Sequence, residues 1–361
     1  MRTHLHFKIV CALICLPFIA FANNSWKGRY TKEKTIKKEF SVSSNTTLEI
    51  DNSYGNLDIT TWDENRIEIV VSITTNGNNE EKVQKKLDNI DVDFSESSNY
   101  VSAETKFNKN KSRSWWNWGN NNVNMKINYT IKMPMSNNVK LSNDYGAIDI
   151  DKLKGRAEIS CDYGKITTKE LMADNNDVRF AYTNNCYFEY IKSGEVNADY
   201  SSYTISKAKT LDINANYTKS TIENAENVIY KNDYGSLKVD NINNIEGNGD
   251  YLTLRLGNVY GNIAVKADYG SFKIDNLAAN AGNVNIQSDY MKITIGYDAA
   301  YSFDFEFDLD YTSLRGGDNF EYNKKIVKSM NKYYLGYHGK ANSGNSIKIT
   351  SDYGSLNFNQ N

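Results

Sequence analysis

The sequence has 361 residues and a formal net charge of −2, and hydrophobic and charged residues make up 40% and 24% of it. The length suits one large domain or two ordinary ones, and the balance excludes wholesale disorder and the basic surface of a nucleic-acid-binding protein. Tyrosine (26) and glycine (22) are abundant and proline (2) is rare, which favours strands and tight turns. Two of the three histidines lie in the first six residues, within the export signal described below, so the mature chain keeps only His338. Sites that need two histidine ligands, including most zinc sites, are therefore excluded.

Residues 1–22 have the organisation of an export signal. Arg2 and Lys8 accompany a short apolar run over residues 9–21, and residues 20–22 form an A-x-A cleavage site. The alternative, a buried N-terminal helix, is disfavoured. We predict cleavage after Ala22 and export to the periplasm or the cell surface. No later stretch reaches 18 apolar residues, so no transmembrane helix is expected after cleavage.

Residues 23–135 are predicted to form a β-rich capping region with one short helix. The helix is expected within residues 78–90, where Val83, Leu87 and Ile90 share one face. Alternating residues from Val123 to Met133 predict a long strand. Pro134, the only proline after the predicted cleavage site, follows this strand and marks a junction. Such a region would cover the open sheet edge of a solenoid that begins after it.

Residues 136–361 contain a repeat of 17–21 residues built around the string DYG or a close variant. Apolar residues usually lie four and six positions before the repeat tyrosine and three and five positions after it. An outlying copy contains Tyr54, and the last interval, of 42 residues, predicts one degenerate coil before the final copy. The repeat tyrosines are Tyr145, Tyr163, Tyr182, Tyr200, Tyr217, Tyr234, Tyr251, Tyr269, Tyr290, Tyr311 and Tyr353.

This pattern predicts an all-β fold in which residues 136–361 form a parallel β-helix. The apolar residues stand at even positions before the tyrosine and at odd positions after it, so the chain must bend there to keep both sets facing one core. The glycine after the tyrosine, such as Gly235 or Gly270, is expected to supply a positive φ at the bend. Right-handed coiling is expected from the general crossover preference. An antiparallel meander or sandwich is the competing fold, but it need not repeat a bend at one phase.

An ordered series of motifs resembles a known family. The series is S-Y-G-N-L-D-I (residues 53–59), W-D-x-N-x-I-E-I (residues 62–69), the charged helix, Met133-Pro134 and N-D-Y-G-A-I-D-I (residues 143–150). It is similar to the bacterial "putative adhesin" family of β-strand-repeat envelope proteins, with a GIN-domain-like adhesin head and an undefined function. The resemblance implies export and a β-helix-like fold, and it brings no catalytic residues or cofactors.

Three groups of residues are candidates for a site. Trp115, Trp116 and Trp118 occur in a polar segment, where they would either bind a ligand, such as a glycan or an envelope protein, or form a flap over the end of the β-helix. The aspartates before the repeat tyrosines form a column that could bind calcium, but hydrogen bonding to their own bends is the favoured interpretation, and no metal is expected. The tyrosines are expected to stack at an inward-facing corner.

Two cysteines, Cys161 and Cys186, remain after the predicted cleavage, and export would permit a disulfide between them. They are six positions out of phase in the repeat, which places them about 20 Å apart unless the bend folds them together. We therefore expect two separate thiols, with Cys161 facing inward, and no disulfide.

These features predict a non-enzymatic, exported cell-envelope protein, an adhesin-like binding or structural module without a cofactor. A sensing or accessory factor for a membrane partner is an alternative that the sequence does not separate from adhesion. A polysaccharide-active enzyme is disfavoured, because the acidic residues lie in a regular column rather than in an irregular acid/base cluster.

Overall fold

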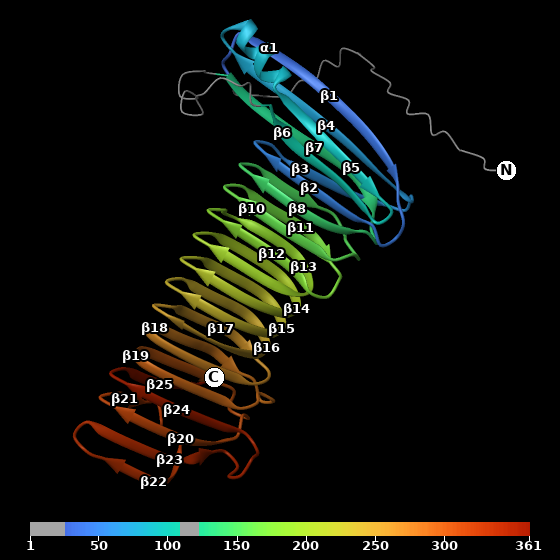
Figure 1. The fold of residues 1–361 in the computed structure, drawn as a ribbon. Helices are drawn as coiled ribbons and strands as arrows, with labels where there is room; N and C mark the ends of the chain where they lie inside the picture. Colours follow the sequence, from blue (N-terminus) through green and yellow to red (C-terminus); the bar gives the residue numbers. More distant parts are fainter. Residues whose placement is uncertain (1–25, 109–122) are drawn as a thin grey trace, which may run out of the picture.

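The computed structural model describes residues 26–108 and 123–361. Within these ranges the chain is all-β with one short helix, as predicted, and its strands form a long mixed sheet. The strands stack into a rod with a broader sheet at its N-terminal end (Figure 1). The predicted export signal and the segment with Trp115, Trp116 and Trp118 lie outside the described residues.

The N-terminal end is an antiparallel sheet with a helix on it. Strands β1 (Tyr30–Ser41), β4 (Arg66–Gly77) and β7 (Val123–Pro134) pair antiparallel, and β5 (Ile90–Ser97) forms a hairpin with β6 (Tyr100–Phe107). Helix α1 (Glu80–Asp88) begins where the Asn79 side chain accepts a 3.0 Å hydrogen bond from the Lys82 amide, and it buries Val83 and Leu87. The predicted helix and the predicted strand before Pro134 are confirmed.

The coil around Tyr54 is the first of the stack. Its strands β2 (Thr47–Ser53) and β3 (Leu57–Trp62) lie between two layers. On one side they pair in parallel with β6 and β7, and on the other with β8 (Asn138–Asp144) and β9 (Ala147–Ile150). The outlying sequence copy is therefore continuous with the repeats, and the N-terminal sheet covers its open edge.

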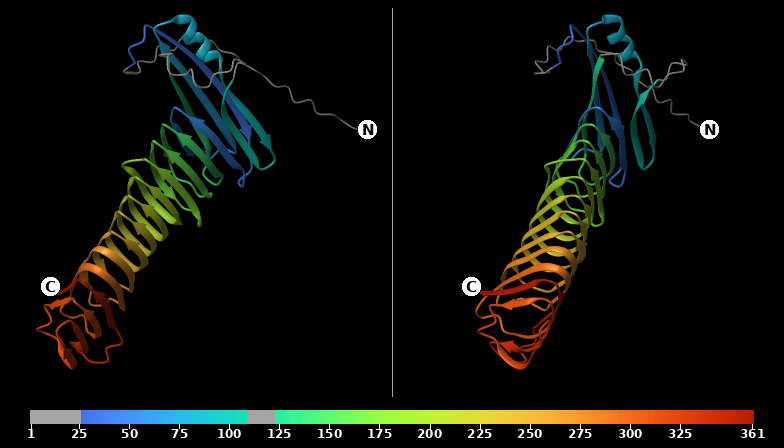
Figure 2. Two further views of the ribbon diagram at one scale, coloured as in Figure 1. Left: turned by 60° about the vertical axis from the view of Figure 1, so that its left-hand side comes forward. Right: turned by 90° about the vertical axis from the view of Figure 1, so that its left-hand side faces the viewer.

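The middle of the rod is a stack of parallel-paired coils (Figure 2). Residues at equal repeat positions are register partners: Ile205 pairs with Ile222, and Ile222 with Val239. All three are fully buried, so like residues form rows along a shared core. The hand of the coil stays a prediction. The strands are β10 (Ala157–Asp162), β11 (Lys165–Leu171), β12 (Asn176–Ala181), β13 (Cys186–Asp199), β14 (Ser202–Asn216), β15 (Lys219–Asp233), β16 (Ser236–Asp250), β17 (Thr253–Val259), β18 (Ile263–Leu277) and β19 (Val284–Tyr297).

At the C-terminal end, the order of the strands in space differs from their order in the chain. The last strands of the chain, β24 (Ser346–Asp352) and β25 (Ser355–Gln360), lie between β19 and the earlier strands β20 (Phe303–Asp310) and β21 (Ser313–Arg315). A hairpin of β22 (Glu321–Val327) and β23 (Asn331–His338) then pairs antiparallel with β20. The predicted degenerate coil between Tyr311 and Tyr353 is therefore wrong, because this segment forms a hairpin that covers the outer edge of β20.

The bend in each coil is made by the tyrosine and not by the glycine after it. Tyr234 and Tyr269 have φ of 53° and 56°, whereas Gly235 and Gly270 are not among the described residues with positive φ. A Cβ on Gly270 would lie 2.1 Å from the carbonyl oxygen of Leu252 in the preceding coil. The predicted reason for the glycine is thus wrong: it permits a close approach between coils and does not supply the left-handed backbone.

Candidate functional site

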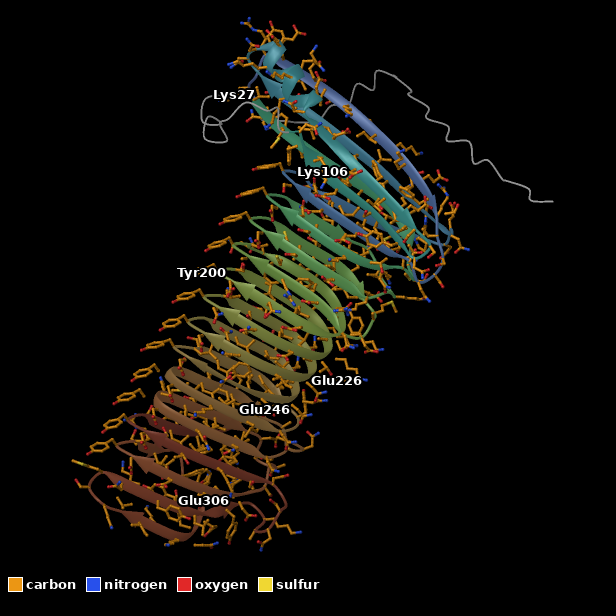
Figure 3. All side chains as sticks on the ribbon, viewed as in Figure 1. Lys27, Lys106, Tyr200, Glu226, Glu246 and Glu306 are labelled. Atoms are coloured by element: carbon orange, nitrogen blue, oxygen red, sulfur yellow. The ribbon has the colours of Figure 1, made fainter. Side chains whose placement is uncertain are left out.

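The repeat tyrosines form a continuous row of rings along one side of the rod, which we call the tyrosine column. Figure 3 shows this row projecting from the coils, with Tyr200 labelled. Because the last strands insert beside β19, Tyr353 stacks between Tyr290 and Tyr311. In spatial order the column is Tyr54, Tyr145, Tyr163, Tyr182, Tyr200, Tyr217, Tyr234, Tyr251, Tyr269, Tyr290, Tyr353 and Tyr311.

The rings of the tyrosine column are stacked nearly parallel. Neighbouring centroids are 4.6–5.2 Å apart and neighbouring planes differ by 2–10°. At the N-terminal end, Tyr54 forms a T-shaped pair with Phe107, with centroids 6.3 Å apart. Such pairs typically contribute about 0.5–1.5 kcal/mol each beyond the area they bury. The column therefore stabilises the stack and keeps the rings in one line.

The tyrosine column does not face inward, which corrects the sequence-based expectation. Tyr145 is 53% exposed and Tyr217 is 50% exposed, and the others are similar except Tyr54, which is 37% exposed. The left-handed backbone at each tyrosine turns its side chain out of the coil. Residues two positions before and three positions after it fill the interior instead, as Ala198 and Tyr203 do around Tyr200.

The left-handed conformation recurs at every member of the tyrosine column, with φ of 49–66°. It is uncommon for bulky residues and costs about 1–2 kcal/mol per residue. Backbone hydrogen bonds between coils hold this conformation. The Tyr145 amide donates to the Asp162 carbonyl at 2.9 Å, and the Tyr234 amide donates to the Asp250 carbonyl at 2.9 Å. A strained conformation repeated in this way projects a large polar aromatic side chain into solvent at each coil.

The aspartates that precede the column tyrosines form a parallel line, which we call the aspartate row. Their carboxylates bridge coils: Asp162 accepts from the Ala181 amide at 3.1 Å, and Asp233 from the Asp250 amide at 2.9 Å. At these positions the partner is thus the next coil and not the residue's own bend. The row comprises Asp144, Asp162, Asp199, Asp233, Asp250, Asp268, Asp289, Asp310 and Asp352.

The aspartate row has an unfavourable electrostatic environment at some positions. Burial raises the pKa of Asp144, and the neighbouring carboxylates of Asp162 and Asp51 raise it further. The pKa of Asp352 is raised in the same way, by burial first and then by Asp289 and Asp310. Over the residues that the structure describes, no group of three or more histidine, cysteine, aspartate or glutamate side chains is arranged to hold a metal ion.

Cys161 and Cys186 are free and Cys161 faces inward, as predicted, and Cys186 is buried as well. Their positions are closer than a distance along extended strands suggests. In the next coil, the register partner of Cys161 is Phe180 and that of Cys186 is Tyr203. The rings of Phe180 and Tyr203 are 5.6 Å apart across the corner. The bend thus folds the two thiols toward each other. Burial raises the pKa of Cys161 to about 12 and that of Cys186 to about 11, so neither is an activated nucleophile at neutral pH.

The one histidine after the predicted cleavage site is also unsuited to acid–base chemistry at the surface. His338 is buried, and its ring packs against Tyr297 and Phe303 with centroids 5.0 and 5.4 Å away. Its Nδ1 lies 3.3 Å from the Asn319 carbonyl oxygen. Its surroundings make it part of the aromatic core at the C-terminal end.

No family model matches the chain, and no curated protein matches its sequence. Among solved structures it is similar to a "putative cell adhesion protein" from Clostridium sporogenes, at 13% identity and a TM-score of 0.19, over 92% of this chain and 100% of the other. A "putative adhesin" from Parabacteroides distasonis has 9% identity and a TM-score of 0.35, over 90% and 97% of the two chains. A "putative lipid binding protein" from the same species has 10% identity and a TM-score of 0.29, over 92% and 98%.

The names of the first two neighbours agree with the family resemblance of the sequence. At these identities and TM-scores, the neighbours carry no argument about what the chain binds. In the described parts of the chain, the helix is too short to cross a membrane.

Proposed function

We propose that the protein is an exported, non-enzymatic binding module of the cell envelope, coiled as a right-handed β-helix, and that the tyrosine column is its binding surface. The observation that carries the proposal is the exposed column itself. The same strained conformation recurs at twelve tyrosines and leaves each of them 37–53% exposed, although an inward residue would bury more apolar area.

Export is supported by the sequence of residues 1–22. The test is N-terminal sequencing of the protein recovered from the envelope fraction of cells that produce the full chain. A mature terminus at Asn23 supports export with cleavage, and an intact Met1 in the cytoplasmic fraction contradicts it.

Binding is tested with beads that carry the purified protein and a panel of polysaccharide and protein polymers. The variant Tyr200→Asn/Tyr217→Asn/Tyr234→Asn removes three neighbouring rings, and asparagine tolerates the positive φ better than most residues. Capture that is lost in this variant, while thermal unfolding stays cooperative, supports the proposal. Equal capture by both proteins, or polymer cleavage that is abolished by changing one acidic residue, contradicts it.

The tryptophan segment stays a prediction of the sequence. Replacing Trp115, Trp116 and Trp118 together with alanine should abolish ligand capture if they bind, and should lower stability and promote aggregation if they cover the rod's end. A blue-shifted, quencher-resistant tryptophan fluorescence component that disappears in this variant contradicts the exposed-site hypothesis.

A further inference from the structure

The exposed ring edges and hydroxyl groups of the tyrosine column suit one class of ligand. On the basis of the binding module proposed above, we propose that the column binds a linear 1,4-linked polysaccharide without acidic groups, which lies along the rod with about one sugar to each coil.

The stacking decides how the column can recognise a partner. Each inner ring has both faces covered by its neighbours, as Tyr217 is covered by Tyr200 at 4.8 Å and by Tyr234 at 5.0 Å. A ligand therefore meets ring edges and hydroxyl groups and cannot stack on a ring face. Among the described residues, none of these hydroxyls has a protein hydrogen-bond partner. They form a line of groups that can each donate and accept.

Short polar residues flank the tyrosine column on the side opposite the aspartate row. Two positions after the tyrosine, outward-facing serine or threonine recurs in the coils, and we call these residues the hydroxyl row. Six of the coils thus present a carboxylate, a phenol and a small hydroxyl side by side, which suits a partner with several hydroxyls per repeat unit. The hydroxyl row comprises Ser202, Ser236, Thr253, Ser271, Ser313 and Ser355.

The spacing of the column suits a polysaccharide better than a polypeptide. The rings repeat every 4.6–5.2 Å in a nearly straight line, which is close to the length of one 1,4-linked pyranose. An extended peptide advances about 3.3 Å per residue and about 6.6 Å per side chain on one face, so it loses register with the coils. The coils also pair with one another along the stack, which leaves no free strand edge beside the column for a peptide to join.

The charge of the surface narrows the class further. Nine carboxylates stand in the aspartate row, whereas the position of the hydroxyl row has a lysine in only three of the coils, at Lys165, Lys219 and Lys292. A polysaccharide of uronic acids would be repelled along its length, and neutral or amino sugars would not. Weak contacts repeated at each coil add up when the chain is long, because each further sugar is already held near its site.

The test measures affinity against chain length by calorimetry. The protein purified after export is titrated with 1,4-linked glucan oligosaccharides of two to ten sugars, with their amino-sugar counterparts and with 1,4-linked galacturonan. The variant carries Tyr→Phe at Tyr182, Tyr200, Tyr217, Tyr234 and Tyr251, which keeps the stack and removes five hydroxyls. The matched control carries Tyr187→Phe and Tyr260→Phe, since both tyrosines are exposed outside the column.

We expect affinity to rise with each added sugar, to fall by about tenfold or more in the five-site variant and to be unchanged in the control. Galacturonan should bind more weakly than the other two series. Affinity that is independent of chain length, or equal in the variant and the wild type, overturns the inference. If no glycan binds but a protein polymer is captured through the column, the polysaccharide is excluded and the binding module stands. If nothing is captured, both proposals fail.

Discussion

In the middle of the rod, from β14 to β18, every coil lies between two coils of similar length, whereas the first and last coils have another coil on one side only. Middle residues have as neighbours their own counterparts in the coils before and after. At the N-terminal end, β6 and β7 take the missing place; they are parallel to the first coil and antiparallel to β5 and β4. At the C-terminal end, β23 takes it and pairs antiparallel with β20. Repetition therefore stabilises the middle, and the ends depend on packing particular to their own residues.

The largest effect is expected at the C-terminal end. Phe320 is 6% exposed, and its ring lies 5.0 Å from that of Phe305 and 5.1 Å from that of Phe358. Phe320→Ala should lower the free energy of unfolding by about 3–5 kcal/mol. Because coils couple only to their neighbours, hydrogen exchange should lose protection from β20 to β25 and keep it from β14 to β18. Uniform loss of protection along the rod would contradict the distinction between end and middle.

A smaller loss is expected from a glycine of a middle coil. Gly270→Val places side-chain atoms against the Leu252 carbonyl, and overpacking of this kind costs about 1–3 kcal/mol or more. The control is Gly344→Ala in an end loop, where a Cβ meets nothing within 4 Å and only the φ of 95° opposes the change. In chemical denaturation, the free energy of unfolding of Gly270→Val should be well below that of Gly344→Ala. The reverse order would mean that the coils are not in close contact at Gly270.

The tyrosine column offers a test that separates stacking from backbone strain. Tyr217→Ala removes two ring contacts and should cost about 1–3 kcal/mol. Tyr217→Gly removes the same contacts, but glycine accepts the φ of 51° and should be more stable than alanine by about 1 kcal/mol. Thermal unfolding of the two variants measures the difference. If alanine equals or exceeds glycine, the corner is not left-handed at position 217.

The smallest effect concerns the aspartate row. Because the pKa of Asp144 is raised in the folded protein, the fold favours the protonated form, and ionisation lowers stability as the pH rises from the unfolded value of about 3.9 through the folded one. Asp144→Asn should therefore raise the free energy of unfolding at pH 7 by less than about 1 kcal/mol and should have little effect below pH 4. Equal gains at both pH values would remove the electrostatic explanation.

The sequence predicts what is local or repeated. The helix over Glu80–Asp88 follows from its own apolar face and cap, and the inward rows follow from a pattern found in coil after coil. The side on which the tyrosines lie was not predictable from the pattern alone. Counted with the strand before it, the tyrosine falls in the inward-facing set. Counted with the strand after it, the same residue falls in the outward-facing set.

The arrangement of the last coils was unpredictable for another reason. Residues 303–310 and 346–352 both have a strand pattern, and nothing in either pattern states which one pairs with β19. The choice is made by long-range packing, in which the β22–β23 hairpin covers β20 and leaves β24 beside β19. Likewise, the distance between Cys161 and Cys186 depends on how sharply the chain bends at the corner, and the number of residues between them does not give that angle.

Disulfide cross-linking between column positions tests the stacked, outward-facing column most directly. In a Cys161→Ser/Cys186→Ser background, cysteines replace pairs of tyrosines, and the fraction that forms a bond under mild oxidation is measured. Stacked positions in adjacent strands suit disulfide geometry. Cross-linking of 290 with 353 and of 353 with 311, without cross-linking of 290 with 311, is the predicted result. Cross-linking of 290 with 311 but not with 353 would contradict the account, because it would restore a stack in simple chain order.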